Sequence, residues 1–403
     1  MPAPITPSRN VPRRPCGRIG PALWLAAALL LAAPCGPGGC SGPGRSTEPS
    51  ARAGADPAQA RPAQHEPRRL SAAGTPAEIG RALGRELAPD IRRMHALFLR
   101  VGELTALQGK KRLYERAEAM ARHLSAEDRA EIAGLAEGAG IPFEDALYLN
   151  LFYDLSYGPA SCRGLAVWGA SSAGGRLLHA RNLDWPDYPG GPLQRNNLIL
   201  NVRPAGGIEY CFLSWPGLQA VLTGTNRKGL TVSFDQLPSA PGGERLAEPV
   251  LFTLKRVLRS CASAEEAARL LVDANPMGSG SILISDSGGK TALVVELSGG
   301  KVGVRRPAAD ASMIGNANHA TREAGLPGLR HGDAGWPACA VAAEMKKPLD
   351  AAAAERVLAD PRVLQKINIV SVVFDPGGNK MHLSCGRLAA AEGVFREYRI
   401  FGE

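Results

Sequence analysis

Between Thr75 and about Tyr157, apolar residues recur with the period of an α-helix. Thr75, Pro76 and Glu78 combine an N-cap, a proline at the first helical position and a capping-box glutamate, which predicts a helix start. A second helix is predicted to begin at Ser125 and to stop near Gly140, and a third opens at Pro142. Apolar residues at helical spacing support the first helix: Ile79, Leu83, Leu87, Ile91, Met94 and Phe98.

After Cys162 the pattern changes to short apolar runs joined by glycine-containing turns, which is typical of β-strands. Helices are predicted among them at 247–259, 263–274 and 350–358. Strands, helices and strands again favour antiparallel sheets covered by helices, an α+β layered architecture. The predicted strands cover residues 165–168, 176–183, 197–202, 209–214, 218–223, 230–234, 281–285, 292–297, 302–305, 367–374 and 380–383.

The first 72 residues have the pattern of an export signal and a tether. Within residues 1–40, arginines precede the apolar run 22–33, which is too short to span a bilayer and predicts a secretory signal. Small residues then precede Cys40, as in bacterial lipoprotein signals, although Pro37 stands where an aliphatic residue is usual. Residues 41–72 are polar and rich in Gly, Pro and Ala, as in a disordered linker. We therefore expect an exported periplasmic, outer-membrane or cell-surface protein, with membrane anchoring through a lipidated Cys40 as a hypothesis.

Composition narrows the function classes. The 403 residues are 45% hydrophobic and 21% charged, which fits a globular protein with a large core. The formal charge of +9 owes much to arginines in the first 70 residues, outside the predicted folded part, so it gives little support for nucleic-acid binding. No Cys-x-x-Cys or Cys/His cluster points to a metal, and no cofactor is implied. Five cysteines follow the signal, an odd number that leaves at least one thiol unpaired: Cys162, Cys211, Cys261, Cys339 and Cys385.

One hairpin carries candidate chemistry. Cys162 opens an apolar run, a glycine-rich turn follows near Ala173, and a second apolar run ends in Arg181, Asp184 and Trp185. An antiparallel hairpin with this turn places Asp184 opposite Cys162 and Arg181 on the same strand. A thiol beside a cation has a lowered pKa and becomes a usable nucleophile. The alternative from these residues alone is a buried structural cysteine beside a structural Arg/Asp pair.

Four stretches together resemble the N-terminal-nucleophile hydrolase superfamily. They are residues 75–84, residues 131–150, the hairpin 162–185 with its closing Arg-Asn-Leu-Asp-Trp, and segments between Thr225 and His319. The pattern is most similar to the acyl-coenzyme A:isopenicillin N acyltransferase-like group, with choloylglycine hydrolases and acid ceramidase as more distant relatives. The resemblance implies a four-layer αββα sandwich over residues 162–403. It also implies that residues 73–161 form a helical pro-segment or companion α subunit.

The same resemblance implies self-cleavage between Ser161 and Cys162. Cys162 is then the nucleophile, and its freed α-amino group, with a reference pKa near 8, is the base. Because the nucleophile carries its own base, no triad histidine is needed, and His179 and His319 are interpreted as structural.

Further site roles follow residue by residue from the family pattern. Arg181 contacts the sulfur, Asp184 holds the new ammonium group, and Asn318 donates to the oxyanion. Trp185 is assigned to substrate binding. A further polar substrate-binding position falls on Asp235 or Gln236, of which Gln236 is the better donor because Asp235 would repel an oxyanion.

The resulting hypothesis is an exported, autoproteolytic cysteine amidohydrolase or acyltransferase. It would act on the C–N bond of a non-peptide N-acyl amide or lipid-like small molecule, with its own N-terminal fragment as partner. The alternatives are a lipid esterase or phospholipase-like hydrolase, and a catalytically impaired, surface-anchored binding lipoprotein of the same fold. One departure leaves these open, because the family usually has Ser or Thr after the nucleophile and this chain has Arg163.

Overall fold

A computed structural model describes residues 64–106, 109–155, 162–237, 246–321, 324–326 and 337–402. The predicted signal with Cys40, most of the predicted linker and Ser161 lie outside these residues. No helix of the described part is both long and apolar enough to cross a lipid bilayer.

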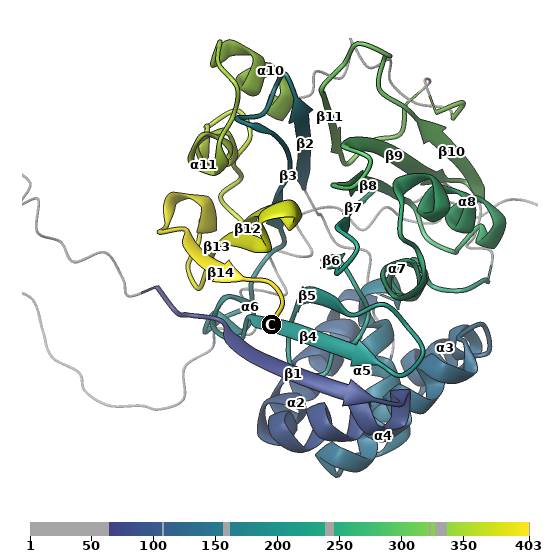
Figure 1. Ribbon diagram of the computed structural model, residues 1–403. Helices are drawn as coiled ribbons and strands as arrows, with labels where there is room; N and C mark the ends of the chain where they lie inside the picture. The colour runs from purple at the N-terminus through teal and green to yellow at the C-terminus, as the bar shows by residue number, and fades with distance from the viewer. Residues whose placement is uncertain are drawn as a thin grey trace, which may run out of the picture.

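The N-terminal segment is mainly helical, as predicted, although its described part has four helices and the sequence had indicated only three. They lie together at one end of the molecule (Figure 1). The capping box is present: the Glu78 carboxylate accepts from the Thr75 N–H at 2.8 Å, and the Glu78 N–H donates to the Thr75 hydroxyl at 3.4 Å. Gly80 lets two helices touch, since a Cβ there would lie 2.0 Å from the Glu131 carbonyl oxygen. The helices are α2 (Pro76–Ala106), α3 (Lys110–Ala121), α4 (Ala126–Ala139) and α5 (Phe143–Leu155).

The N-terminal segment also contributes a strand, which corrects the predicted linker boundary at residue 72. Strand β1 (Arg68–Gly74) pairs in parallel with β4 (Leu198–Pro204). Leu70 and Ala72 alone give it an apolar alternation, which is too short a signal to detect in a polar stretch. The segment is therefore built into the sheet of the predicted catalytic domain.

Eight described strands form the first sheet, in the order β1-β4-β5-β6-β7-β8-β9-β10. Every pairing after β1–β4 is antiparallel. The remaining strands are β5 (Tyr210–Ser214), β6 (Thr223–Asn226), β7 (Leu230–Gln236), β8 (Gly280–Asp286), β9 (Thr291–Ser298) and β10 (Lys301–Arg305).

Six described strands form the second, fully antiparallel sheet, in the order β11-β2-β3-β12-β13-β14. The sequence patterns did not predict β11 or β14. β11 reads Met-Ile-Gly-Asn-Ala, and glycine and asparagine are depleted in strands. The strands are β2 (Arg163–Gly169), β3 (Gly175–Asp184), β11 (Met313–Ala317), β12 (Asn368–Asp375), β13 (Lys380–Cys385) and β14 (Arg396–Arg399).

The two sheets face each other between layers of helices, which confirms the α+β sandwich. Helices α7 (Val250–Ser260) and α8 (Ala264–Ala274) cover the first sheet, and α10 (Pro337–Glu344) and α11 (Ala351–Ala359) cover the second (Figure 1). Short helices at Pro192–Arg195 (α6), Pro376–Gly378 (η1) and Ala390–Glu392 (η2) complete the described elements. A small apolar cluster fills part of the space between the sheets: Ala166, Trp168, Leu177, Leu283, Ala292, Val294 and Ile314.

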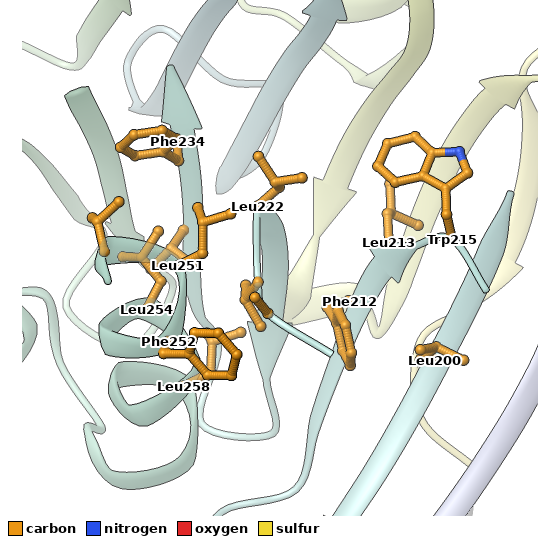
Figure 2. Packing of buried hydrophobic residues seen from close by; sticks show 14 of the residues in the cluster. Leu200, Phe212, Leu213, Trp215, Leu222, Phe234, Leu251, Phe252, Leu254 and Leu258 are labelled. Atoms are coloured by element: carbon orange, nitrogen blue, oxygen red, sulfur yellow. The ribbon is translucent and has the colours of Figure 1, made fainter. Parts of the chain in front are cut away.

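Helix α7 anchors the first sheet by its apolar side. Figure 2 shows Leu251, Leu254 and Leu258 of this helix projecting toward the strands that carry Phe212 and Phe234. All five side chains are buried. Burying a side chain of this size contributes about 1.5–3 kcal/mol, so this contact fixes β7 and the residues at its end.

The strand predicted at residues 218–223 is instead a buried loop, and β6 begins only at Thr223. A helix side chain satisfies the loop's main chain, which in a strand would be bonded by a neighbouring strand. The Asn150 amide of α5 donates to the Gly217 carbonyl at 2.8 Å and accepts from the Gln219 N–H at 2.8 Å. The apolar side chains that gave the strand-like pattern, among them Ala220, Val221 and Leu222, belong to the main hydrophobic cluster.

Candidate active site

The hairpin from Cys162 forms as predicted, but its register differs by one residue. Arg163 faces Asn182 and Gly164 faces Arg181, so continuing the register places Leu183, rather than Asp184, opposite Cys162. Asp184 still lies near the thiol, since its main chain is among the groups that lower the pKa of Cys162 against the effect of burial. A bulge beside it, where the β12 register slips between Asn368 and Val370, accompanies this local geometry.

Arg181 joins the two sheets at the thiol. Its guanidinium leaves β3, donates to the Cys162 sulfur at 3.6 Å and continues to β6 and β7, where it bonds the Thr223 hydroxyl and the Phe234 carbonyl. Only 1% of Arg181 is exposed, so its orientation is fixed by these acceptors. The structure thus brings together the cation and the sulfur that the sequence paired.

Asp235 is the counterion of Arg181, with a carboxylate oxygen 3.6 Å from the arginine Nε. Burial raises the pKa of Asp235 to about 6, against the opposing charge of Arg181. Gln236, the other residue considered at this position, reaches the site through its main chain, since its carbonyl accepts from Asn318. The sequence indicated only that Asp235 would be a poor oxyanion donor. It gave no sign of the ion pair between Asp235 and Arg181.

Asp184 lies at the end of β3, fully buried, and accepts from the Asn368 amide at 2.9 Å. Asn368 is in turn fixed by the Ser371 hydroxyl, which donates to its oxygen at 2.9 Å. The second carboxylate oxygen of Asp184 has no hydrogen-bond partner within the described ranges. Burial raises the pKa of Asp184 to about 8, although the Asn368 hydrogen bond and the charge of Arg163 oppose this. The site therefore holds a carboxyl group with room for a further donor.

Asn318 reaches Cys162 because β11 runs beside β2. Ala317 pairs with Arg163, so the next residue, Asn318, lies opposite Cys162. Its amide oxygen accepts from the Cys162 N–H, and its amide nitrogen donates to the Gln236 carbonyl at 2.7 Å. Gly164 makes this approach feasible, since a Cβ there would lie 2.1 Å from the Asn316 amide oxygen.

Arg163 is a site residue to which the sequence assigned no role. Its Nη1 donates to the Cys162 carbonyl at 2.7 Å and to the Asn318 amide oxygen at 3.3 Å. The side chain is half-buried, beside the nucleophile candidate. Its cationic side chain therefore lies among the groups that surround Cys162.

The thiol is not ionised by its surroundings. Burial raises the pKa of Cys162 to about 12, and the Arg181 charge only partly offsets it. A thiol of this kind needs a base in contact with it to become a nucleophile at neutral pH. His179 does not serve, because burial lowers its pKa to about 3 and its ring bonds Ser285 at 2.8 Å and Ser233 at 2.9 Å.

The cysteines that follow the predicted signal carry free thiols: Cys162, Cys211, Cys261, Cys339 and Cys385. In the described part of the chain, no group of three or more His, Cys, Asp and Glu residues is arranged to hold a metal ion.

An apolar pocket adjoins the site and encloses about 510 Å³ of atom-free space, its open mouth included. Residues adjacent in sequence to Asp184, Thr223 and Asn368 line one part of it. The N-terminal helices α2 and α5, the short helix α6 and the loop before β6 line the rest. Its walls are Phe98, Leu149, Phe152, Tyr153, Leu183, Trp185, Leu193, Trp215, Pro216, Leu218, Leu222 and Ile369.

Several known proteins resemble this chain. Residues 172–332 match the family model of the acyl-coenzyme A:6-aminopenicillanic acid acyl-transferases. The match includes Arg181, Asp184 and Asn318 and begins after Cys162 and Arg163. Two curated relatives are protein dcd1A of Dictyostelium discoideum and the N-acylethanolamine-hydrolyzing acid amidase of Caenorhabditis elegans. They are 26% identical over 152 residues and 27% identical over 158 residues, and each alignment covers 36% of this chain. The chain spans only 34% and 44% of their lengths.

Solved structures give more distant matches. The C. elegans N-acylethanolamine-hydrolyzing acid amidase ortholog is 19% identical, with a TM-score of 0.44, over 54% of this chain and 93% of that one. A variant of the conjugated bile acid hydrolase of Clostridium perfringens is 16% identical, with a TM-score of 0.42, over 60% and 96%. Over residues 172–332 this protein is thus similar to the acyl-coenzyme A:6-aminopenicillanic acid acyl-transferases, in agreement with the resemblance seen in its sequence.

Proposed function

We propose that this protein is a self-cleaving cysteine amidohydrolase or acyltransferase. The observation that carries the proposal is the convergence of three side chains on Cys162. Arg181 contacts its sulfur, Asn318 accepts from its nitrogen, and Arg163 donates to its carbonyl. Both the sulfur and the nitrogen of one residue are thus held, as a nucleophile that also supplies its own base requires.

In the proposed activation, the Cys162 thiol adds to the carbonyl carbon of Ser161. The C–N bond to Cys162 breaks, a thioester forms, and water then hydrolyses it to leave a free Cys162 amine. The buried, unshared oxygen of Asp184 supports this step, because an ammonium group formed beside it gains a partner. Burial raises the pKa of Asp184 to about 8, and a cation beside the carboxylate would offset the cost of burying its charge.

In turnover the amine takes the thiol proton, and the thiolate attacks the substrate's acyl carbon. Charge develops on the carbonyl oxygen, and we assign the Asn318 amide nitrogen as a donor to it. The ammonium then protonates the leaving amine. Water or an acceptor amine attacks the acyl-enzyme and regenerates the thiol. Arg181, neutralised by Asp235, stabilises the thiolate between these steps.

The apolar pocket supports an apolar acyl group on the substrate. Its walls are almost entirely apolar side chains, as expected of a site that holds an apolar group. Leu183 and Trp185 line the pocket and flank Asp184 in sequence. The pocket wall therefore lies close to the Cys162 thiol. Trp185 keeps its assignment to substrate binding. The name of the acid amidase relative, which describes N-acylethanolamine hydrolysis, supports testing N-acyl amides first.

We further propose that the predicted companion segment 73–161, extended at its start to include all of β1 from Arg68, stays bound after cleavage. Strand β1 pairs with β4 along its length, and Lys255 of α7 binds Glu131 of α4 at 2.6 Å. A discarded pro-segment would expose the sheet edge and leave these charges unpaired. Gel filtration of the cleaved protein tests this: both fragments should elute together, and separate elution refutes it.

Export and lipidation remain proposals that rest on the sequence of residues 1–40. Labelling cells with a fatty acid checks them. The wild-type chain should take up label, and Cys40→Ala should not. Equal labelling of both, or none of either, removes the lipoprotein proposal.

The central test is the intact mass of the purified chain with and without Cys162→Ala. Wild type should give two fragments that meet at Ser161/Cys162, and the variant should give one chain. Hydrolysis of matched fatty-acyl amides and esters then separates an amidase from a lipid esterase. Hydrolysis that persists in Cys162→Ala would refute the site, and an intact wild type that hydrolyses amides would refute the amine-as-base mechanism.

A further inference from the structure

Arg163 and the Cys162 nitrogen share one acceptor. The Cys162 N–H and the Arg163 Nη1 both donate to the Asn318 amide oxygen, the latter at 3.3 Å. The same Nη1 donates to the Cys162 carbonyl at 2.7 Å, so the guanidinium binds one end of Cys162 directly and the other end through Asn318. A single oxygen therefore separates a permanent cation from the nitrogen that cleavage would free.

The other charges around this nitrogen come from several elements. β3 brings Arg181 and Asp184, and β7 brings Asp235. Arg181 is paired with Asp235, and its guanidinium is directed at the sulfur. Asn318 and Asn368, which follow β11 and open β12, are neutral, and the titratable His319 follows Asn318. Arg163 is thus a second cation, and it binds the same Asn318 oxygen that accepts from the Cys162 nitrogen.

Like charges disfavour each other's ionised forms, and a guanidinium stays protonated at every relevant pH. An ammonium group at Cys162 would be attracted by Asp184 and repelled by Arg163. An enzyme that uses this amine as a base needs it neutral when substrate binds. Asp184 by itself would hold the amine in its protonated, inactive form.

We propose that Arg163 is a positioning residue that fixes the Asn318 amide and keeps the freed Cys162 amine in its neutral form near neutral pH. This inference rests on the proposed self-cleaving function. The two contacts to the Asn318 oxygen also set the orientation of that amide, since a flipped amide would point N–H groups at both donors. The nitrogen end is thereby directed to the Gln236 side, where we assign the oxyanion.

The test compares Arg163→Gln with Arg163→Lys. Glutamine can still donate to the Asn318 oxygen but carries no charge, and lysine keeps the charge without the planar fork. Intact mass first shows which chains have cleaved at Ser161/Cys162, and thermal unfolding shows that they fold. The pH dependence of kcat/KM is then measured on a medium-chain fatty-acyl p-nitroanilide, because kcat/KM reports the ionisations of the free enzyme.

In cleaved Arg163→Gln, we expect the acid limb of the kcat/KM profile to move to higher pH by about one unit, because the amine loses a neighbouring positive charge. One unit is the usual size of pKa differences between protein sites. The acid limb of Arg163→Lys should stay near the wild-type value. A cleaved, folded Arg163→Gln whose limb overlays wild type overturns the inference and leaves the self-cleaving enzyme standing. If Arg163→Gln does not cleave, the test rests on Arg163→Lys. An acid limb of its kcat/KM profile that moves to higher pH, although the charge is retained, also overturns the inference. An uncleaved wild type overturns both proposals.

Discussion

A buried ion cluster between α4 and α7 gives the sharpest stability prediction. Lys255 binds the carboxylates of Glu131 at 2.6 Å and Asp128 at 3.2 Å, and all three side chains are largely excluded from solvent. Burial alone would lower the pKa of Lys255, but the two carboxylates outweigh it and hold this pKa above its usual value. The cluster joins the N-terminal segment to the sandwich, so its loss tests how firmly the two are held.

Lys255→Met leaves two buried carboxylates without a cation. Breaking a buried pair in this way costs about 3–5 kcal/mol. With a urea m-value of about 3 kcal/mol/M, a loss of about 4 kcal/mol lowers the unfolding midpoint by about 1.3 M. Fluorescence-monitored urea unfolding of the intact Cys162→Ala chain measures it without interference from cleavage.

A surface ion pair provides the matched control. Arg306 and Glu265 lie 2.7 Å apart, as close as the buried pair, but about half of each side chain is exposed. Arg306→Met should therefore cost less than about 1 kcal/mol, because solvent screens the charges. Adding Glu131→Leu to Lys255→Met should recover part of the loss by removing one stranded charge. If Lys255→Met shifts the midpoint no more than Arg306→Met, the argument from burial is wrong.

Three further predictions concern the site. Gly164→Ala, whose Cβ would meet the Asn316 amide 2.1 Å away, should destabilise the fold by about 1–3 kcal/mol, as measured by urea unfolding; an unchanged midpoint would show that Asn316 gives way. Burial raises the pKa of Asp184 to about 8 in the folded chain, whereas an unfolded Asp titrates at about 4. The stability that the protonated carboxyl contributes is therefore fully present below about pH 4 and is lost as pH rises to about 8. Unfolding of the Cys162→Ala chain should therefore become easier over this range by several kcal/mol, at about 1.4 kcal/mol per pKa unit, and adding Asp184→Asn should flatten the profile; parallel profiles would contradict this. Leu218→Trp should lower kcat/KM for long-chain acyl amides about tenfold and spare short-chain ones, since it fills the pocket; equal losses would place the acyl chain elsewhere.

The sequence by itself predicted most of the helices and strands and the approach of Arg181 to Cys162. Helical periodicity and the Thr75 and Ser125 caps gave the N-terminal helices, because both signals are local. The hairpin could be read because its strands are joined by a short turn, so Cys162, Arg181 and Asp184 met within 23 residues. Its register was missed by one residue, since a bulge shifts facing positions without leaving a periodic trace.

The tertiary structure alone decided which distant residues complete the site. Asn318 was named only through a family resemblance, and its place opposite Cys162 depends on β11, whose Gly and Asn give no strand signal. Asp235 became the partner of Arg181 because the two sheets face each other, and Asn368 meets Asp184 through strand pairing. Arg163 looked like a departure from a pattern, and only its contacts to Cys162 and Asn318 gave it a role to test. Local patterns record what a residue does to its own strand or helix, whereas contacts across sheets depend on packing that no short stretch of sequence encodes.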